Sequence, residues 1–170
     1  MERNEKRLFA SLLAAAALLI STFTFAQQAV ILGPDELGKV VPSNFYFEGQ
    51  LAPTQMRNAA AVRFAPQRHL IAALVDNSGY ASDIRAKYEG FLISDVAVII
   101  GGVEVKTGAY GFGFTKDSKM NLLDLGGKPV YSAATRRDEK FQSPRPLAIV
   151  QSGNELRLYR GREYVVIASK

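Results

Sequence analysis

The sequence predicts an all-β protein, an antiparallel β-sandwich or barrel of roughly nine to eleven short strands. The clearest strand signal lies at residues 109–115, where Tyr110, Phe112 and Phe114 alternate with small residues, so that one face of the strand would carry every ring. Turn residues recur about every 8 to 12 positions, as they do in sandwiches and barrels. The expected strands do not alternate with long amphipathic helices, which disfavours a parallel α/β sheet.

The first 26 residues have the pattern of a cleaved signal peptide. A charged start at residues 2–7 precedes an apolar run at residues 8–25, and small residues lead to a cleavage site after Ala26. The alternative is an uncleaved anchor, because the apolar run is near the lower length limit for crossing a bilayer. We expect cleavage. Residues 27–170 would then form one all-β domain, exported to the periplasm or out of the cell, with no membrane span of its own.

Composition narrows the chemistry that this domain could support. The chain of 170 residues has no cysteine and one histidine, which excludes disulfides and thiolate catalysis and leaves a zinc or copper site dependent on scattered carboxylates. We therefore expect neither a metal nor a cofactor. The formal net charge of +5 is spread along the chain, without the dense basic stripe that nucleic-acid binding needs.

In the first half of the domain the sequence predicts short strands separated by turns. The alanine run at residues 59–61 favours a helix by propensity, but β-formers follow it and a partner run lies at residues 70–75, so we expect a hairpin that turns at residues 65–68. The other expected elements are a short strand at 39–41, an aromatic strand at 45–47 closed by Gly49, a helical turn or loop at 52–58, a helical turn at 82–87 capped by Ser82, and a strand at 88–93.

In the second half the turns are easier to place. Gly101-Gly102 is a two-residue hairpin signal, and residues 115–119 form the next turn. Residues 135–146 are polar and end with two prolines, which indicates an exposed loop, with or without a short helix at its start.

The C-terminal segment predicts a three-stranded meander with a defined register. A two-residue loop at Gly161-Arg162 would pair Arg160 with Glu163, Tyr159 with Tyr164, Leu158 with Val165, and Leu156 with Ile167. A second turn at Gly153-Asn154 would place Ile149 opposite Leu158. Two independent turns therefore put the apolar side chains on the same face, which strengthens both assignments.

The hairpin and strand at residues 100–114 resemble a family of uncharacterised exported bacterial β-domains. In those domains a short hairpin, here Ile100-Gly101-Gly102, is followed by a strand that opens with Gly, a small residue and Tyr, here Gly108-Ala109-Tyr110. The resemblance covers about 15 residues. It implies an exported β-domain and no named site.

One candidate group for ligand binding lies in the central strand. Gly111 and Gly113 present no side chain next to Tyr110, so either a neighbouring ring such as Phe91 or Tyr131 packs against the strand or a ligand does. We expect packing.

A second candidate group for ligand binding lies in the C-terminal hairpin. Arg157, Tyr159 and Tyr164 are expected to share its outer face, where tyrosine rings can stack on a sugar and a guanidinium can hold a carboxylate. An ordinary solvated sheet face has the same composition.

His69 is the one histidine, so any Ser-His-Asp arrangement must use it. The expected hairpin places it opposite Phe64 at the rim of a sheet, with Asp76, Ser78 and Ser82 close in sequence. No G-x-S-x-G nucleophile pattern occurs in the chain. A rim histidine without a catalytic role is the simpler interpretation.

These observations favour an exported, non-catalytic binding module over an enzyme. Its partner would be an envelope protein, a glycan or a small apolar ligand. The alternative is a small periplasmic hydrolase that uses His69 with a nearby carboxylate.

Overall fold

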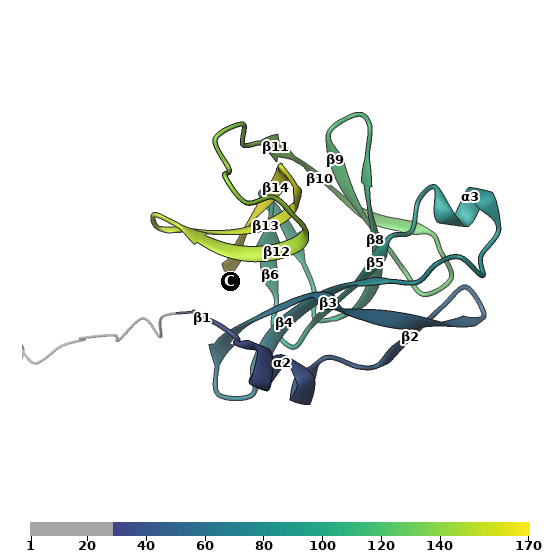
Figure 1. Ribbon diagram of the computed structural model, residues 1–170, viewed down its shortest axis with the longest axis horizontal. Coiled ribbons are helices and arrows are strands. Elements are labelled where there is room, and N and C mark those ends of the chain that lie inside the picture. The colour runs from purple at the N-terminus through teal and green to yellow at the C-terminus, as the bar shows by residue number, and fades with distance from the viewer. Residues whose placement is uncertain (1–28) are drawn as a thin grey trace, which may run out of the picture.

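The structure is a computed structural model and describes residues 29–170. The expected signal peptide lies outside the described residues. Two antiparallel sheets face each other (Figure 1). Strand β12 contacts β3 and strand β10 contacts β7, so the sheets meet at two corners. No strand pairing joins the two sheets across these corners in the described part of the chain, which is therefore an open, sandwich-like fold and not a closed barrel.

The larger sheet has the strand order β1-β3-β4-β5-β8-β9-β10, and β2 pairs with β3. Its strands are β1 (Val30–Ile31), β2 (Asn44–Phe47), β3 (Gln50–Ala65), β4 (Arg68–Val75), β5 (Gly90–Ser94), β8 (Gly108–Thr115), β9 (Lys119–Leu123) and β10 (Pro129–Ala134). Two short helices accompany this sheet, α2 (Pro34–Val40) and α3 (Ser82–Arg85).

The smaller sheet has the order β12-β13-β14-β6-β7, and β11 pairs with β14. Its strands are β6 (Val98–Ile100), β7 (Val103–Val105), β11 (Arg136–Arg137), β12 (Arg145–Ser152), β13 (Glu155–Gly161) and β14 (Glu163–Ser169). The all-β prediction is confirmed. The described residues hold 14 strands, more than expected, and two of them, β1 and β11, are two-residue strands that no pattern marks.

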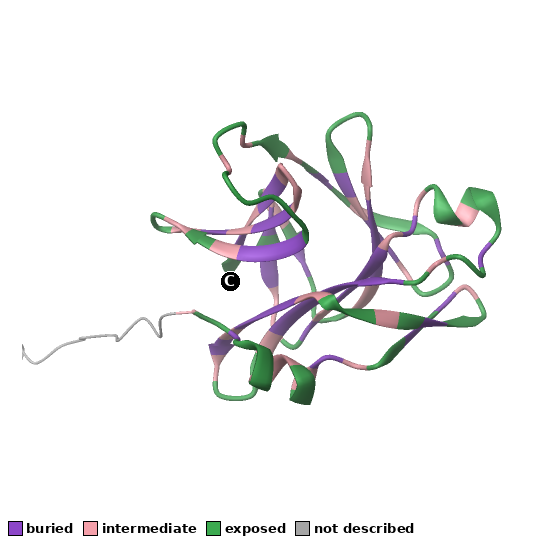
Figure 2. Ribbon diagram, in the orientation of Figure 1, coloured by how far each residue is buried: buried purple, intermediate pink, exposed green. Residues whose placement is uncertain are grey.

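The core lies between the two sheets, where the buried segments of the strands gather (Figure 2). Every second residue of a strand points into it, as the alternation of strand side chains requires. Phe112 is fully buried there, and Tyr110 and Phe114 pack against the same core. The prediction that one face of this strand carries all the rings is thus confirmed.

A second apolar layer covers the outer face of the larger sheet, and we call it the outer apolar layer. It is built around the rings of Phe45, Phe47, Tyr80, Tyr88 and Phe91, which come from β2, from β5 and from the segments before and after α3. Phe47 stacks on Tyr88 with ring centroids 3.9 Å apart, and Phe45 stacks on Phe91 at 4.6 Å. The larger sheet is therefore buried on both faces, which explains why β4 is apolar at nearly every position.

The two glycines of the central strand are packed against this layer. A Cβ atom at Gly111 would overlap the ring of Phe47, and one at Gly113 would overlap the carbonyl oxygen of Lys87. Packing was expected, but from a different residue. Phe91 is the cross-strand partner of Gly111, yet the closest atoms belong to Phe47.

The expected turns and registers of the second half are confirmed. Gly101 and Gly102 both have positive φ and connect the pair Ile100 and Val103, as a two-residue hairpin turn requires. All four expected pairs between β13 and β14 are present, and Ile149 lies opposite Leu158.

Several expectations in the first half are wrong. Residues 34–40 form α2 in place of a strand at 39–41, because Pro34 opens the helix and two acidic residues occupy its first turn. Residues 52–58 belong to β3 and are not a helical turn or loop. They remain extended because β3 pairs with β2 at one end and with β4 at the other.

Two smaller corrections concern single positions, and a third concerns a segment. Helix α3 begins after Ala81, without a side-chain cap, so Ser82 is not its cap. His69 lies opposite Arg63 and not opposite Phe64, because an irregularity between Arg63 and Ala65 shifts the register by one residue. The segment 135–146, expected as an exposed loop with or without a short helix, contains β11 and the first two residues of β12, and it has no helix.

Candidate functional site

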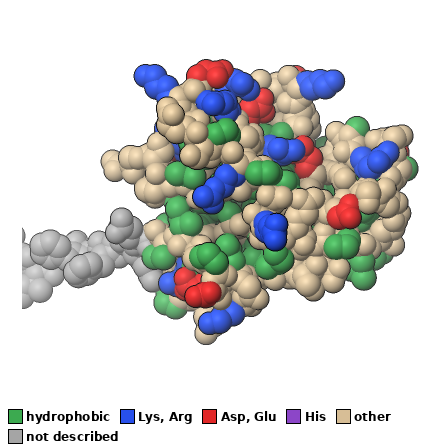
Figure 3. Space-filling view, viewed as in Figure 1, with side chains coloured by type: hydrophobic (Ala, Val, Ile, Leu, Met, Phe, Trp, Pro, Cys, Tyr) green, Lys and Arg blue, Asp and Glu red, His purple; other side chains and the backbone are tan. Residues whose placement is uncertain are grey.

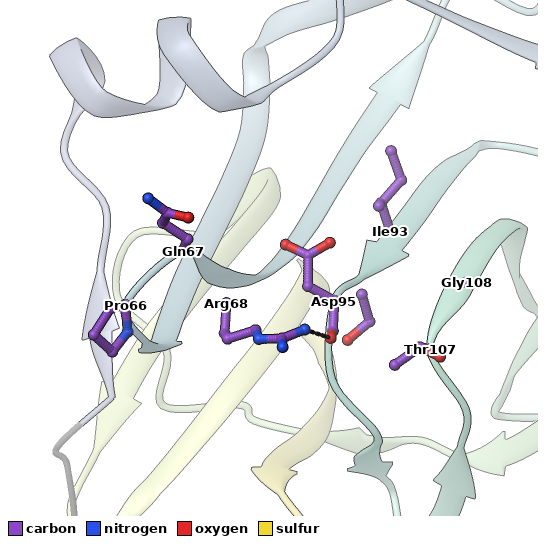
Figure 4. A pocket seen from close by; sticks show the side chains of 8 residues that line it. Pro66, Gln67, Arg68, Ile93, Asp95, Thr107 and Gly108 are labelled. Carbon is purple, nitrogen blue, oxygen red and sulfur yellow. Dashed lines mark hydrogen bonds between the residues drawn. The ribbon is translucent and has the colours of Figure 1, made fainter.

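A cleft of about 750 Å³ lies at one end of the central strands of the larger sheet, and we call it the turn cleft (Figure 4). It forms where three strand ends meet, because Ser94 at the end of β5 pairs with Leu70 near the start of β4 and with Gly108 at the start of β8. The cleft is lined by Pro66, Gln67, Arg68, Ile93, Ser94, Asp95, Thr107 and Gly108.

The lining of the turn cleft carries both hydrogen-bond donors and acceptors. The guanidinium of Arg68 donates to the backbone oxygen of Asp95 at 3.2 Å, which holds it across the cleft (Figure 4). Its remaining N–H groups, the carboxylate of Asp95, the amide of Gln67 and the hydroxyl of Thr107 are polar groups of this lining. Ile93 and Pro66 add a small apolar surface.

Asp95 also holds the one histidine of the chain. Its backbone N–H donates to the His69 oxygen at 2.9 Å, and its Oδ2 accepts the His69 backbone N–H at 3.2 Å. The same Oδ2 lies 3.6 Å from Nδ1 of the imidazole, whose side chain is 15% exposed. At this distance the ring and the carboxylate are not hydrogen-bonded, so Asp95 lies beside the His69 ring but does not orient it through the hydrogen bond that a catalytic dyad has.

Among the described residues, no serine or threonine hydroxyl forms a hydrogen bond with the His69 side chain, so a nucleophile for a catalytic triad is missing there. Ser94 points into the core, on the opposite face from His69, because its partner Leu70 does so, and its hydroxyl donates to the Val96 oxygen at 2.7 Å. Asp76 and Ser78 follow the far end of β4, roughly 20 Å from His69 at the rise of an extended strand. Proximity in sequence was therefore misleading for these residues.

The structure brings Arg157, Tyr159 and Tyr164 together on the outer face of the smaller sheet, as expected. The Arg157 guanidinium lies 4.5 Å from the centre of the Tyr164 ring, and the rings of Tyr159 and Tyr164 are 5.1 Å apart. Nη2 of Arg157 pairs with Glu155 at 2.7 Å, and the Tyr159 hydroxyl donates to Asp138 at 2.9 Å.

This cluster is largely occupied by its own contacts. Phe141 stacks on Tyr159 at 4.3 Å, which leaves Tyr159 only 1% exposed, and Tyr164 is 7% exposed. Burial raises the pKa of Tyr159, and Asp138 raises it further, against the opposing effect of Arg157. Hydrogen bonds to Tyr159 and Glu155 raise the pKa of Arg157. A sugar would meet ring edges here, and an acidic group would compete with Glu155.

The other expected binding residues lie elsewhere. Tyr110 packs into the core, with its ring 5.7 Å from that of Tyr131 and its hydroxyl donating to the Lys106 oxygen at 3.0 Å. Burial, followed by the effect of Tyr131, raises its pKa. Gly111 and Gly113 are buried beside protein atoms. The six expected residues therefore form two separate groups on different sheets.

Sequence reasoning missed the residues of the turn cleft. Arg68 begins β4, Asp95 follows β5 and Thr107 precedes β8, so their proximity depends on how these three strands pair. The sequence predicts the turn at 65–68 and a strand that opens at Gly108, but no local pattern indicates that these segments meet at one end of the sheet.

Among residues 29–170, no group of three or more His, Asp or Glu side chains is arranged to hold a metal ion. No helix in this part of the chain has the length and apolar character needed to cross a membrane. On the face shown in Figure 3, lysine and arginine side chains are scattered among uncharged and acidic ones and do not form a stripe.

The comparisons with known proteins add no information about the fold or the site. Scans against models of protein families, curated proteins and solved structures each found no match.

Proposed function

We propose that this chain is an exported, non-catalytic binding module that takes a polar, hydroxyl-rich ligand of the glycan type in the turn cleft. The observation that carries this proposal is the mixed lining of the cleft, in which Arg68 and Thr107 can donate and Asp95 and Gln67 can accept. Sugar hydroxyls are both donors and acceptors, so they need such a lining. Export rests on the signal-peptide pattern of residues 1–26.

The other partners considered fit the described surface less well. A small apolar ligand needs an enclosed apolar cavity, whereas the space between the sheets is filled by buried side chains. An acidic protein would find the Arg157 guanidinium already paired with Glu155 and close to Asp138. The turn cleft is open and polar, which suits a ligand that keeps part of its hydration.

The pairing of His69 with Asp95 favours one second candidate, a small hydrolase in which the histidine activates water. His69 does not line the turn cleft, so such an enzyme would hold its substrate beside Asp95, at the margin of the cleft. A binding module would leave its ligand unchanged, whereas a hydrolase would release products from it.

The test is a glycan array followed by calorimetric titration of the strongest ligand. Arg68→Ala and Thr107→Ala should each weaken binding, Arg68→Ala by about tenfold or more, because a hydrogen bond from a charged group is lost. Arg145→Ala is the matched control, since Arg145 is exposed on β12 and outside the cleft. Unchanged affinity in both cleft variants would disprove the proposed site.

The same ligand should be recovered intact after long incubation with the protein. Release of products that His69→Ala abolishes, with its thermal unfolding unchanged, would make the hydrolase the correct assignment.

A further inference from the structure

A second polar cavity lies at the opposite end of β4 and β5 from the turn cleft. It has a volume of about 200 Å³, and we call it the seam pocket because residues of both sheets line it. Leu74 and Val75 contribute the end of β4, Glu89 precedes β5, and Arg160 comes from β13 of the smaller sheet. Gln55, Asn77 and Arg85 complete the lining.

Glu89 and Arg160 connect the two sheets at this pocket. Nη2 of Arg160 lies 3.2 Å from Oε1 of Glu89, and Oε2 of Glu89 accepts the backbone N–H of Phe114 at 3.1 Å. Both oxygens of the carboxylate are therefore engaged, and Glu89 is fixed in place.

This single hydrogen bond leaves most N–H donors of Arg160 without an acceptor. A guanidinium has five N–H donors, and in the described part of the chain only the one to Glu89 finds a hydrogen-bond acceptor. Its Nε is buried without any partner, which is an uncommon state for a donor in a folded protein. The side chain as a whole is 36% exposed, so the outer part of the fork can be reached from the pocket.

Arg85 adds a second positive charge to the same lining. Its guanidinium has no carboxylate within salt-bridge distance among residues 29–170, because none of their ion pairs includes it. With one carboxylate against two guanidinium groups, the pocket carries an excess of one positive charge. The amide groups of Gln55 and Asn77 are tied to backbone oxygens and do not neutralise it.

We propose that the seam pocket binds a small oxyanion, a carboxylate or phosphate group, between Arg85 and Arg160. The guanidinium fork matches the oxygens of either group in a bidentate way. The volume of about 200 Å³ admits a group of this size. Because the anion would contact both the segment after β4 and the smaller sheet, its binding would link the two sheets. This site does not depend on the turn cleft or on the ligand proposed there.

The test is a titration of the ¹⁵N-labelled exported protein with sodium phosphate and, separately, with sodium acetate, at constant ionic strength maintained with sodium chloride. We expect saturable shifts of the Arg160 Nε–H signal and of the side-chain amides of Gln55 and Asn77, with dissociation constants of about 1 to 10 mM. The comparison of phosphate with acetate identifies which oxyanion the pocket prefers.

Two variants separate a specific site from general ionic effects. Arg85→Gln, at an exposed position of α3, should weaken binding at least fivefold, whereas Arg145→Gln should leave it unchanged. Arg160→Gln should abolish anion binding if the variant folds. If it does not fold, the affinity of Arg85→Gln is the test. Equal shifts in chloride alone, shifts that do not saturate, or parental affinity in Arg85→Gln would overturn the proposal.

Discussion

Tyr88 places a hydroxyl inside the outer apolar layer without a hydrogen-bond partner among the described residues. Its ring stacks on Phe47 and meets the edge of Tyr80 at 5.5 Å, so the ring contributes packing while the hydroxyl only loses hydration. Tyr80 differs, because its single hydroxyl proton lies within reach of two acceptors, the backbone oxygens of Phe47 and Gln50 at 3.0 and 3.1 Å. The hydroxyl of Tyr88 should therefore lower the stability of the fold, whereas that of Tyr80 should raise it.

Removing these two hydroxyls should change stability in opposite directions. Tyr88→Phe should raise the free energy of unfolding by about 1 kcal/mol, because it removes an unsatisfied buried group. Tyr80→Phe should lower it by about 1 kcal/mol, because it breaks hydrogen bonds. Urea denaturation of both variants and the parent at neutral pH measures the two effects. A loss of stability in Tyr88→Phe would mean that its hydroxyl has a partner, such as a buried water.

The same burial predicts a dependence of stability on alkaline pH. Burial, followed by the effect of Tyr80, raises the pKa of Tyr88 well above its ordinary value. The unfolded chain releases this proton near pH ~10 while the folded chain retains it, so the stability contribution is complete below that pH and is lost as the pH rises beyond it. Between about pH 9 and about pH 11, Tyr88→Phe should therefore lose less stability than the parent. Parallel curves would contradict the raised pKa.

The glycines at 111 and 113 show what could be foreseen at the scale of a residue. Their alternation with rings predicts close packing on one face, and the structure confirms it. The identity of the packing partners could not be foreseen, because Phe47 and the Lys87 backbone come from segments that are distant in sequence and reach the strand only in the folded state.

Alanine at these glycines should destabilise the fold. Gly111→Ala should cost about 2 kcal/mol, since Phe47 can shift only by disturbing its stack with Tyr88, and Gly113→Ala should cost more because backbone atoms block the added carbon. Gly38→Ala is the control. Its site in α2 has no atom within 4 Å of an added Cβ, so this change should stabilise by about 0.5 kcal/mol. Denaturant melts of the three variants test the ranking, and parental stability at position 113 would disprove it.

At the scale of elements, strands were predicted in the correct register where short turns connect them. The C-terminal meander was predicted in register because its loops have two residues, and a short loop determines which residues face each other. The hairpin at residues 59–75 was found, but the irregularity between Arg63 and Ala65 shifted His69 by one position. The edge segment at 52–58 was missed because its extended form depends on pairing with β2 and β4, which no local pattern indicates.

The loop at 138–144 offers a test at this scale. Phe141 holds it to β13 by stacking on Tyr159, and the backbone N–H of Asp138 donates to the Arg162 oxygen at 2.9 Å. Phe141→Ala should speed hydrogen exchange of the amide of Asp138 and lower the free energy of unfolding by about 1 kcal/mol. Gln142→Ala, at an exposed neighbouring site, should do neither. Unchanged protection at Asp138 in Phe141→Ala would show that the backbone contacts alone hold the loop.

At the scale of the whole molecule, strand periodicity and turn spacing were sufficient to predict the class of fold. They could not predict the turn cleft or the seam pocket. Each of these sites joins segments that are far apart in the chain, as Arg68 with Thr107 and Glu89 with Arg160 show. Sites built from strand ends depend on sheet order, and sheet order is a property of the assembled fold.

The N-terminal edge of the larger sheet connects the folded domain with the expected processing of the chain. Strand β1 pairs Val30 with Arg63, and Leu32 is buried in the outer apolar layer with its N–H bonded to the Ala61 oxygen at 2.9 Å. Cleavage after Ala26 would leave this edge intact. We therefore expect exported material to have the intact mass of residues 27–170, and a mass that includes residues 8–25 would identify an anchor.

A chain that starts at Gly33 tests how much this edge contributes. It lacks β1 and Leu32, so it loses a buried leucine and the strand pairing beside it, and its free energy of unfolding should be about 2 to 4 kcal/mol lower than that of a chain starting at Gln27. A chain starting at Ala29 is the control, because it keeps Val30 to Leu32 and should match the chain from Gln27. Urea denaturation of the three chains measures the difference. Equal stability of the chains from Gln27 and Gly33 would show that β1 and Leu32 do not stabilise the domain. The fold would then not require that the signal peptide be cleaved before β1.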